Sequence, residues 1–111
     1  MIGYVMVGTN NLDKAIIFYD EVLKIINLER KETDDLCAGY TQTGGDGSVE
    51  FYVTKPANKK TATFGNGTQV SFLVSAREIV DKFHGNLLFT VGGEGKDQKH
   101  LQLFYLKLAG E

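Results

Sequence analysis

The stretch from Ser48 to Thr54 contains the carboxylate best placed for chemistry, Glu50. Apolar and polar side chains alternate along this stretch, with Val49, Phe51 and Val53 set against Glu50, Tyr52 and Thr54. Such alternation predicts a half-buried strand whose second face is polar and aromatic. On a concave sheet surface Glu50 could act as a general base. On an edge strand it would simply face solvent.

Four other side chains could surround a ligand near Glu50. Tyr4 and Gln69 carry hydrogen-bonding groups that could orient a polar substrate. Strand alternation could place Tyr52 and Phe72 with Tyr4 on one concave surface, as an aromatic binding platform. The candidate site therefore has Glu50 as its catalytic residue and Tyr4, Gln69, Tyr52 and Phe72 as its substrate-binding residues.

The remaining reactive residue types indicate no further site. Neither His84 nor His100 has a His, Cys or carboxylate at metal-ligand spacing, so both are predicted to be packing or surface residues. Cys37 has no base near it in the sequence and is predicted to be an inert thiol. The glycine-rich segments 44–47 and 92–95 indicate turns, because neither stands between a strand and a helix as a phosphate loop does.

Charge and composition exclude several classes of function. The chain has 12 basic and 14 acidic residues, interspersed along it, and a formal net charge of −2. Nucleic-acid binding is not expected, because it depends on concentrated basic charge. A single cysteine cannot form an intramolecular disulfide, which favours a cytoplasmic location. No apolar run approaches the ~20 residues that span a bilayer, and the first residues lack a signal-peptide pattern, so no membrane association is expected.

The spacing of apolar residues predicts strands and helices within one domain, 1–111. Ile2 to Gly8 predicts a strand, and from Leu12 to Ile26 apolar residues recur at helical spacing. The same order recurs after a polar linker, with a strand over 69–75 and a helix over 76–86. Further strands are predicted over 36–42, 48–54, 87–91 and 101–108. A strand followed by a helix thus occurs twice.

Two segments resemble the vicinal-oxygen-chelate superfamily, which includes glyoxalases, bleomycin-resistance proteins and extradiol dioxygenases. In the first, Thr9 to Leu23, a polar turn precedes a helix that carries a Phe-Tyr pair and a later Val-Leu pair. The second runs from Gly65 to Phe72 and continues with Arg77, Val80, Phe83 and His84. The resemblance implies an α+β fold of paired βαβββ modules, near 1–56 and 64–111, whose curved mixed sheet forms a cleft.

The same resemblance bears on metal binding. Many members hold a divalent cation through four side chains, one each from the first and fourth strands of the two modules. These positions fall on Tyr4, Glu50 and Gln69, and the fourth has no match. A phenol is a poor ligand for the usual cations, so we expect no resident metal; a divalent cation held by Glu50 and Gln69 is the alternative. Tyr105 to Glu111 resembles the strand and turn before the family's last strand, which is therefore expected to be missing.

Three functional hypotheses follow. The preferred one is a glyoxalase-related, lyase-type enzyme that acts on a small polar or thiol-conjugated molecule through Glu50, with Tyr4 and Gln69 as positioning groups. The alternative is a metal-independent module of the bleomycin-resistance kind, which sequesters an amphipathic ligand in an aromatic and acidic cleft between two subunits. The third is a structural remnant that dimerises through an open sheet edge. The expected partners are a small-molecule ligand and a second copy of the chain, as a homodimer.

Overall fold

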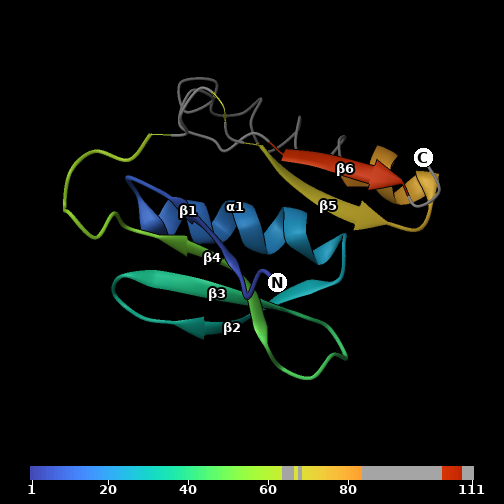
Figure 1. Cartoon of the computed structure of the whole chain (residues 1–111), viewed down its shortest axis with the longest axis horizontal. Helices are drawn as coiled ribbons and strands as arrows, with labels where there is room; N and C mark the ends of the chain where they lie inside the picture. Colours follow the sequence, from blue (N-terminus) through green and yellow to red (C-terminus); the bar gives the residue numbers. More distant parts are fainter. Residues whose placement is uncertain (64–66, 68, 84–103, 109–111) are drawn as a thin grey trace.

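The computed structural model describes residues 1–63, 67, 69–83 and the strand at 104–108. Its elements are β1 (Val5–Gly8), α1 (Leu12–Lys24), β2 (Leu28–Thr33), β3 (Cys37–Gln42), β4 (Val49–Thr54), β5 (Val70–Val74) and β6 (Phe104–Leu108), with a helical segment over 77–83 (Figure 1). The first four strands form one mixed sheet in the order β1-β4-β3-β2, and β5 pairs with β6. The predicted α+β class is confirmed.

The helix α1 begins where the sequence predicts it. The Asn11 side chain accepts a hydrogen bond from the backbone N–H of Lys14 at 3.1 Å, and a cap of this kind stabilises a helix by about 1 kcal/mol. The helix ends at Lys24, two residues before the predicted Ile26, because the chain turns through a left-handed Asn27 (φ 64°) into β2. Among the described residues, no helix is long and apolar enough to cross a membrane.

One face of the four-stranded sheet is covered by α1 (Figure 1). β1 runs parallel to β4, whereas β3 is antiparallel to both β4 and β2. The predicted alternation along β4 is confirmed from Glu50 onward, since Phe51 and Val53 are buried against α1 and Glu50 is exposed. It does not hold for Val49, because a β-bulge at this end of β4 brings its side chain to Gly39, on the face of Tyr52. The largest fully buried side chains are those of Tyr40, Phe51, Leu23, Val22 and Val53.

The strand β2 is absent from the strands that the sequence predicts, because residues 29–35 are mostly charged. In the structure Leu28 is buried and the five following residues of β2 are exposed, so the strand has no apolar alternation to detect. β2 forms the edge of the sheet. Charged side chains on an edge strand discourage pairing with other chains, which explains why this strand reads as a polar loop.

The strand β5 and the helical segment 77–83 pack against the core of the first four strands. Phe72 of β5 contacts Phe51 with ring centroids 5.7 Å apart, and Phe83 is 4% exposed within the same hydrophobic cluster. β5 and β6 run parallel, the relation that β1 has to β4. From the sequence, residues 105–108 are expected to precede the last turn and last strand of the second module. In the structure β6 pairs with β5 as β4, the last strand of the first module, pairs with β1.

Several predictions concern residues outside the described part of the chain. These are the strand over 87–91 and the roles of His84 and His100. The division into modules at 1–56 and 64–111 also stays a prediction. β1, α1 and the next three strands all lie within the first of these ranges.

Candidate functional site

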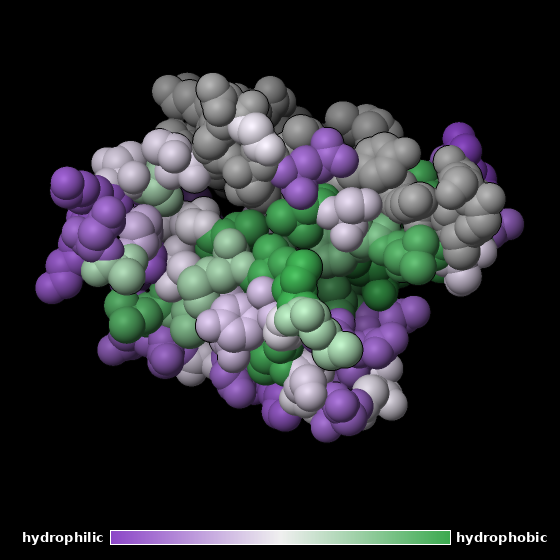
Figure 2. All heavy atoms as spheres, in the orientation of Figure 1, coloured by the Kyte–Doolittle hydropathy of each residue, from purple (hydrophilic) through white to green (hydrophobic). Residues whose placement is uncertain are grey.

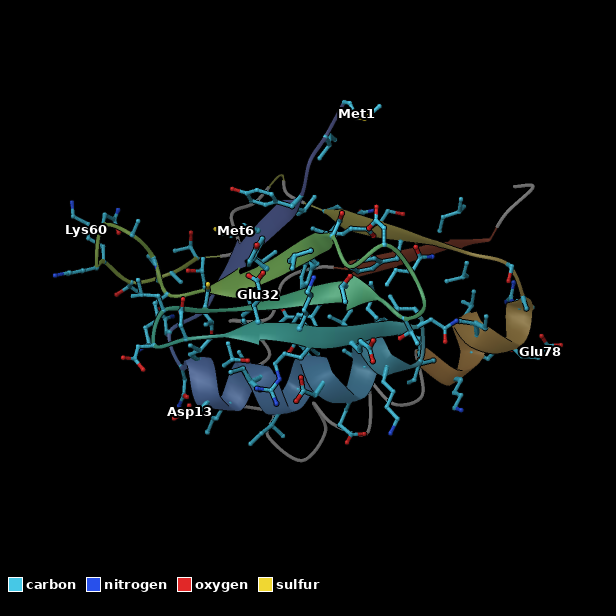
Figure 3. All side chains as sticks on the ribbon, turned by 90° about the horizontal axis from the view of Figure 1, so that it is seen from below. Met1, Met6, Asp13, Glu32, Lys60 and Glu78 are labelled. Atoms are coloured by element: carbon cyan, nitrogen blue, oxygen red, sulfur yellow. The ribbon has the colours of Figure 1, made fainter. Side chains whose placement is uncertain are left out.

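The face of the four-stranded sheet opposite α1, called the open face below, carries most of the predicted site residues. Neighbours in register share a face of a sheet: Met6 pairs with Tyr52, Tyr52 with Gly39, and Gly39 with Glu32. Figure 3 shows Met6 and Glu32 on the side of the sheet away from α1. The open face is lined by Tyr4, Met6, Glu32, Cys37, Gly39, Glu50, Tyr52 and Thr54.

Hydrophobic and aromatic side chains are exposed on this face. Figure 2, which views the molecule from the side of β1, shows a band of hydrophobic residues across its middle, over β1 and toward β5. Tyr4 is 56% exposed and Met6 48% exposed, and the preceding Met1 and Ile2 are exposed as well. An exposed apolar patch of this kind marks a surface that contacts a ligand or another protein.

Tyr4 and Tyr52, two of the three rings expected to share one surface, form an aromatic pair on the open face, and their role in binding a ligand stays a prediction. Their ring centroids lie 5.0 Å apart at an interplanar angle of 74°, which is an edge-to-face contact. The pair joins β1 to β4. It leaves Tyr4 exposed and Tyr52 half-buried, so both rings retain surface that a ligand could cover.

Glu50 lies on the same face of β4 as Tyr52, two residues earlier, and is exposed. β4 lies between β1 and β3, so Glu50 does not stand on an edge strand. Its carboxylate therefore shares a surface with the tyrosine pair. This placement suits electrostatic attraction of a cation as well as it suits proton transfer.

Tyr52 has a second polar neighbour that the sequence analysis missed. Its hydroxyl donates a long hydrogen bond, 3.5 Å, to Oε2 of Glu32 on β2. Partial desolvation and then the negative charge of Glu32 raise the pKa of the Tyr52 phenol above its ordinary value. Nothing in the charged sequence around Glu32 sets this residue apart from its neighbours, because its role depends on the register of β2.

Gly39 was also missed, although a glycine inside a strand is a signal of close approach. It lies opposite Tyr52, whose ring covers it: a Cβ atom at Gly39 would lie 2.9 Å from Cε1 of Tyr52 and 2.9 Å from Cγ1 of Val49. The absence of a side chain at Gly39 thus lets the Tyr52 ring lie across β3 toward Glu32.

Phe72 and Gln69 are not brought to the open face beside the tyrosine pair. Phe72 contacts Phe51, which points to the opposite face of β4 from Tyr52, so Phe72 belongs to the core and the predicted three-ring platform is reduced to two rings. Gln69 lies exposed just before β5. Within the described residues, no hydrogen bond joins Gln69 to Tyr4 or Glu50.

The described residues do not fit the four-ligand metal site of the family. No group of three or more His, Cys, Asp or Glu side chains within them could hold a metal ion. The family positions present a phenol, one carboxylate and one amide, a weak donor set for a divalent cation. Cys37 on the open face is held as a neutral thiol, because burial and then the charge of Asp34 raise its pKa.

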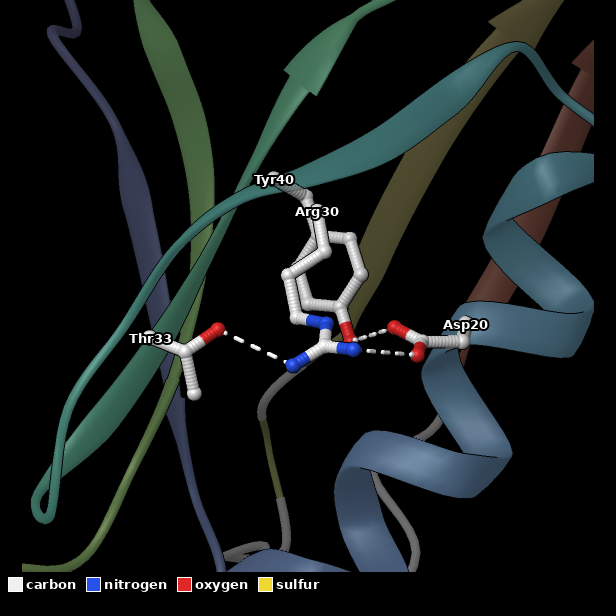
Figure 4. A network of polar contacts seen from close by, with 4 residues as sticks. All are labelled: Asp20, Arg30, Thr33 and Tyr40. Atoms are coloured by element: carbon white, nitrogen blue, oxygen red, sulfur yellow. Dashed lines mark hydrogen bonds and ion pairs between the residues drawn. The ribbon is translucent and has the colours of Figure 1, made fainter.

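A second polar cluster lies on the helix side of the sheet (Figure 4). The buried Tyr40 donates a hydrogen bond of 2.8 Å to Asp20 of α1, which forms an ion pair of 3.2 Å with Arg30. Arg30 also donates to the Thr33 hydroxyl at 3.0 Å. A shallow hollow of about 440 Å³ opens beside this cluster, between α1 and β2. The cluster ties β2 and β3 to α1 and lies away from the tyrosine pair.

Comparisons with known proteins define the fold class of this arrangement. No protein-family model matches the chain, and no curated protein matches it. Among solved structures, a glyoxalase/bleomycin resistance protein from Albidiferax ferrireducens T118 is similar with a TM-score of 0.69 and 28% identity, over 79% of this chain and 70% of that one.

Two further solved structures share the fold at lower identity. A candidate glyoxalase from Bacillus halodurans is similar with a TM-score of 0.63 and 21% identity, over 83% of this chain and 69% of that one. A glyoxylase/bleomycin resistance protein/dioxygenase domain from Frankia sp. EAN1pec is similar with a TM-score of 0.53 and 15% identity, over 100% of this chain and 94% of that one. The chain thus has the glyoxalase/bleomycin-resistance fold, and its resemblance to the vicinal-oxygen-chelate superfamily is confirmed.

Proposed function

We propose that the chain is a ligand-binding protein of the glyoxalase/bleomycin-resistance fold, whose open face holds a small amphipathic cation without a metal. The observation that carries this proposal is the Tyr4–Tyr52 pair, exposed on the same face as Glu50 and Glu32. Aromatic faces and carboxylates are the two groups that attract an organic cation. The exposed Met6 beside them offers contact for an apolar portion of the ligand.

The expected energetics are modest at each contact. A cation over an exposed tyrosine ring gains about 0.5–1 kcal/mol. Glu50 adds an attraction that salt screens, because the carboxylate is exposed. Affinity in the micromolar range or tighter would therefore need several such contacts together, or enclosure of the ligand between two copies of the open face.

Such enclosure is part of the proposal: two chains form a homodimer with the ligand between them. The exposed Tyr4 and Met6 support it, because two open faces that meet would cover apolar surface at the tyrosine pair. Light scattering after size-exclusion chromatography tests it. A mass of one chain, unchanged by ligand, would contradict the dimer.

A lyase-type reaction through Glu50 is the second candidate. It is favoured by the placement of Glu50 on an interior strand beside Tyr4 and Tyr52, where a carboxylate could take a proton from a bound molecule. It is less favoured than binding because the described donors do not fit the metal that stabilises an enediolate in the family.

Calorimetric titration with benzyltrimethylammonium tests the binding function, with its uncharged isostere neopentylbenzene and with benzoate as comparison ligands. We expect the cation to bind more tightly than either, and Tyr52→Ala and Glu50→Gln each to weaken it. Glu21→Gln is the matched control, because Glu21 is exposed on α1. Equal affinities for cation and anion would contradict the proposal, and turnover of a thiol-conjugated carbonyl compound that Glu50→Gln abolishes would favour the lyase.

A further inference from the structure

The position of the Tyr52 ring is set by three neighbours, one just before β1, one on β3 and one on β2. Tyr4 of the segment leading into β1 meets it edge to face, and Gly39 of β3 lies beneath it, where an added Cβ would come within 2.9 Å of the ring. The ring therefore spans the width of β3. Its hydroxyl reaches Glu32 on β2, the strand beyond.

The direction of the hydrogen bond to Glu32 follows from the chemistry of the two groups. An ionised carboxylate can only accept, whereas a phenol has one proton to donate and lone pairs that accept. The Tyr52 proton must therefore point to Glu32. What the phenol oxygen then offers to a ligand is its lone pairs, so toward a ligand Tyr52 acts as an acceptor.

We propose that Glu32 is a positioning residue: it accepts the hydrogen bond of the Tyr52 hydroxyl, so that only the lone pairs of the phenol oxygen face a ligand. The open face then selects cations with N–H donors, such as primary ammonium or guanidinium groups, over quaternary cations and over anions. The inference rests on the proposed function and narrows its ligand class. It also assigns Gly39 a positioning role, since the ring reaches Glu32 only across a residue without a side chain.

The charged and titratable groups around the phenol support this polarity. Glu32 lies at its hydroxyl, and Cys37 and Tyr4 are its other titratable neighbours. A phenol keeps its proton at neutral pH, and desolvation and then the Glu32 charge raise the pKa of Tyr52 further above its ordinary value. A site built to stabilise an oxyanion would need the opposite polarity, a donor aimed at the ligand.

The first test needs no ligand. Tyrosine labelled with ¹³C at Cζ reports each phenol's titration by NMR, with Tyr52 assigned through Tyr52→Phe. We expect Glu32→Gln to lower the pKa of Tyr52 toward its ordinary value and Glu21→Gln to leave it unchanged. A Tyr52 titration that Glu32→Gln does not move would overturn the role of Glu32.

The second test compares benzylammonium with benzyltrimethylammonium, using the ratio of their affinities in each variant. One hydrogen bond is worth roughly a two- to tenfold change in affinity. The ratio should therefore fall by that factor in Tyr52→Phe, which keeps the ring but loses the acceptor. Glu32→Gln should lower it as well, because an amide can donate to the phenol and free its proton.

Gly39→Ala tests the path of the ring. We expect it to weaken binding of both cations and to shift the Tyr4 and Tyr52 resonances. In a Val49→Ala background, which removes the other close contact of the new methyl group, the same losses should persist. Gly3→Ala is the control, since nothing lies within 4 Å of a Cβ there.

The two proposals fail in different ways. If both cations bind but their affinity ratio is the same in wild type, Tyr52→Phe and Glu32→Gln, the selectivity inference is overturned and the proposed function stands. If neither cation binds more tightly than benzoate, the proposed function fails and the inference about its ligand fails with it.

Discussion

Two tyrosine–carboxylate pairs lie on opposite faces of the same sheet, and their surroundings differ. On the helix side, the fully buried Tyr40 donates to Asp20 at 2.8 Å, and Arg30 neutralises that carboxylate (Figure 4). On the open face, the half-buried Tyr52 donates to the exposed Glu32 at 3.5 Å, and among the described residues no cation pairs with Glu32. A hydrogen bond from a tyrosine to a carboxylate therefore links α1 to the sheet on the helix side, whereas on the open face the two groups of such a bond stay accessible to a ligand.

The difference follows from burial. The Tyr40 hydroxyl is buried and must find a partner, and Asp20, whose side chain is 36% exposed, accepts its hydrogen bond and also pairs with Arg30. An exposed carboxylate remains solvated, so leaving it without a partner cation costs little free energy and keeps it available to a ligand. Completeness of pairing therefore distinguishes the structural cluster from the candidate binding surface.

The largest expected difference in stability is between variants of two neighbouring residues of β4. Phe51→Ala should lower the free energy of unfolding by about 3–5 kcal/mol, because it empties a fully buried ring site in the core. Tyr52→Ala should cost far less stability and mainly reduce cation binding. Denaturant titration measures both; similar losses for the two variants would show that the open face is structural.

Gly39→Ala should have the next largest effect. The added methyl group would meet Tyr52 and Val49 at 2.9 Å, and overpacking of this kind costs roughly 1–3 kcal/mol. Thermal unfolding measures the change. Unaltered stability together with unaltered tyrosine resonances would mean that the ring does not need the open space above Gly39.

Alkaline pH should destabilise the protein through the helix side of the sheet. Burial raises the pKa of Tyr19, and burial together with Asp20 raises that of Tyr40, above the ordinary 10.0. The folded state then holds protons that the unfolded chain has lost, so stability falls as pH rises beyond about 10, by ~1.4 kcal/mol per pH unit for each such group. Tyr40→Phe should flatten this fall, and an unchanged slope in that variant would contradict the assignment.

The smallest effect concerns the hydroxyl groups themselves. Tyr40→Phe should cost about 1–2 kcal/mol at pH 7, because a partly buried hydrogen bond to Asp20 is lost while the ring stays. Tyr52→Phe should leave stability nearly unchanged. Chemical denaturation of both variants compares the two hydroxyls directly, and an equal cost would remove the distinction drawn between the faces.

Sequence reasoning succeeded where one local pattern settles the outcome. The apolar spacing from Leu12 and the Asn11 cap determined α1, and the alternation over 48–54 determined β4 and the face on which Glu50 and Tyr52 lie. It failed for β2, where an edge strand needs no apolar side chains after Leu28. It also failed for Phe72, because alternation within β5 cannot say which of its faces meets the core.

By itself the sequence determined the helix, the inner strands and the presence of Tyr4, Tyr52 and Glu50 on polar-aromatic positions, because each depends on residues close together in the chain. The fold class followed from the resemblance to a known superfamily. Only the tertiary structure decided which of these residues meet. The register of β2 and β3 brought Glu32 and Gly39 to Tyr52, and the packing of β5 took Phe72 into the core. Pairing between strands is settled by contacts distant in sequence, and periodicity within one strand carries no information about them.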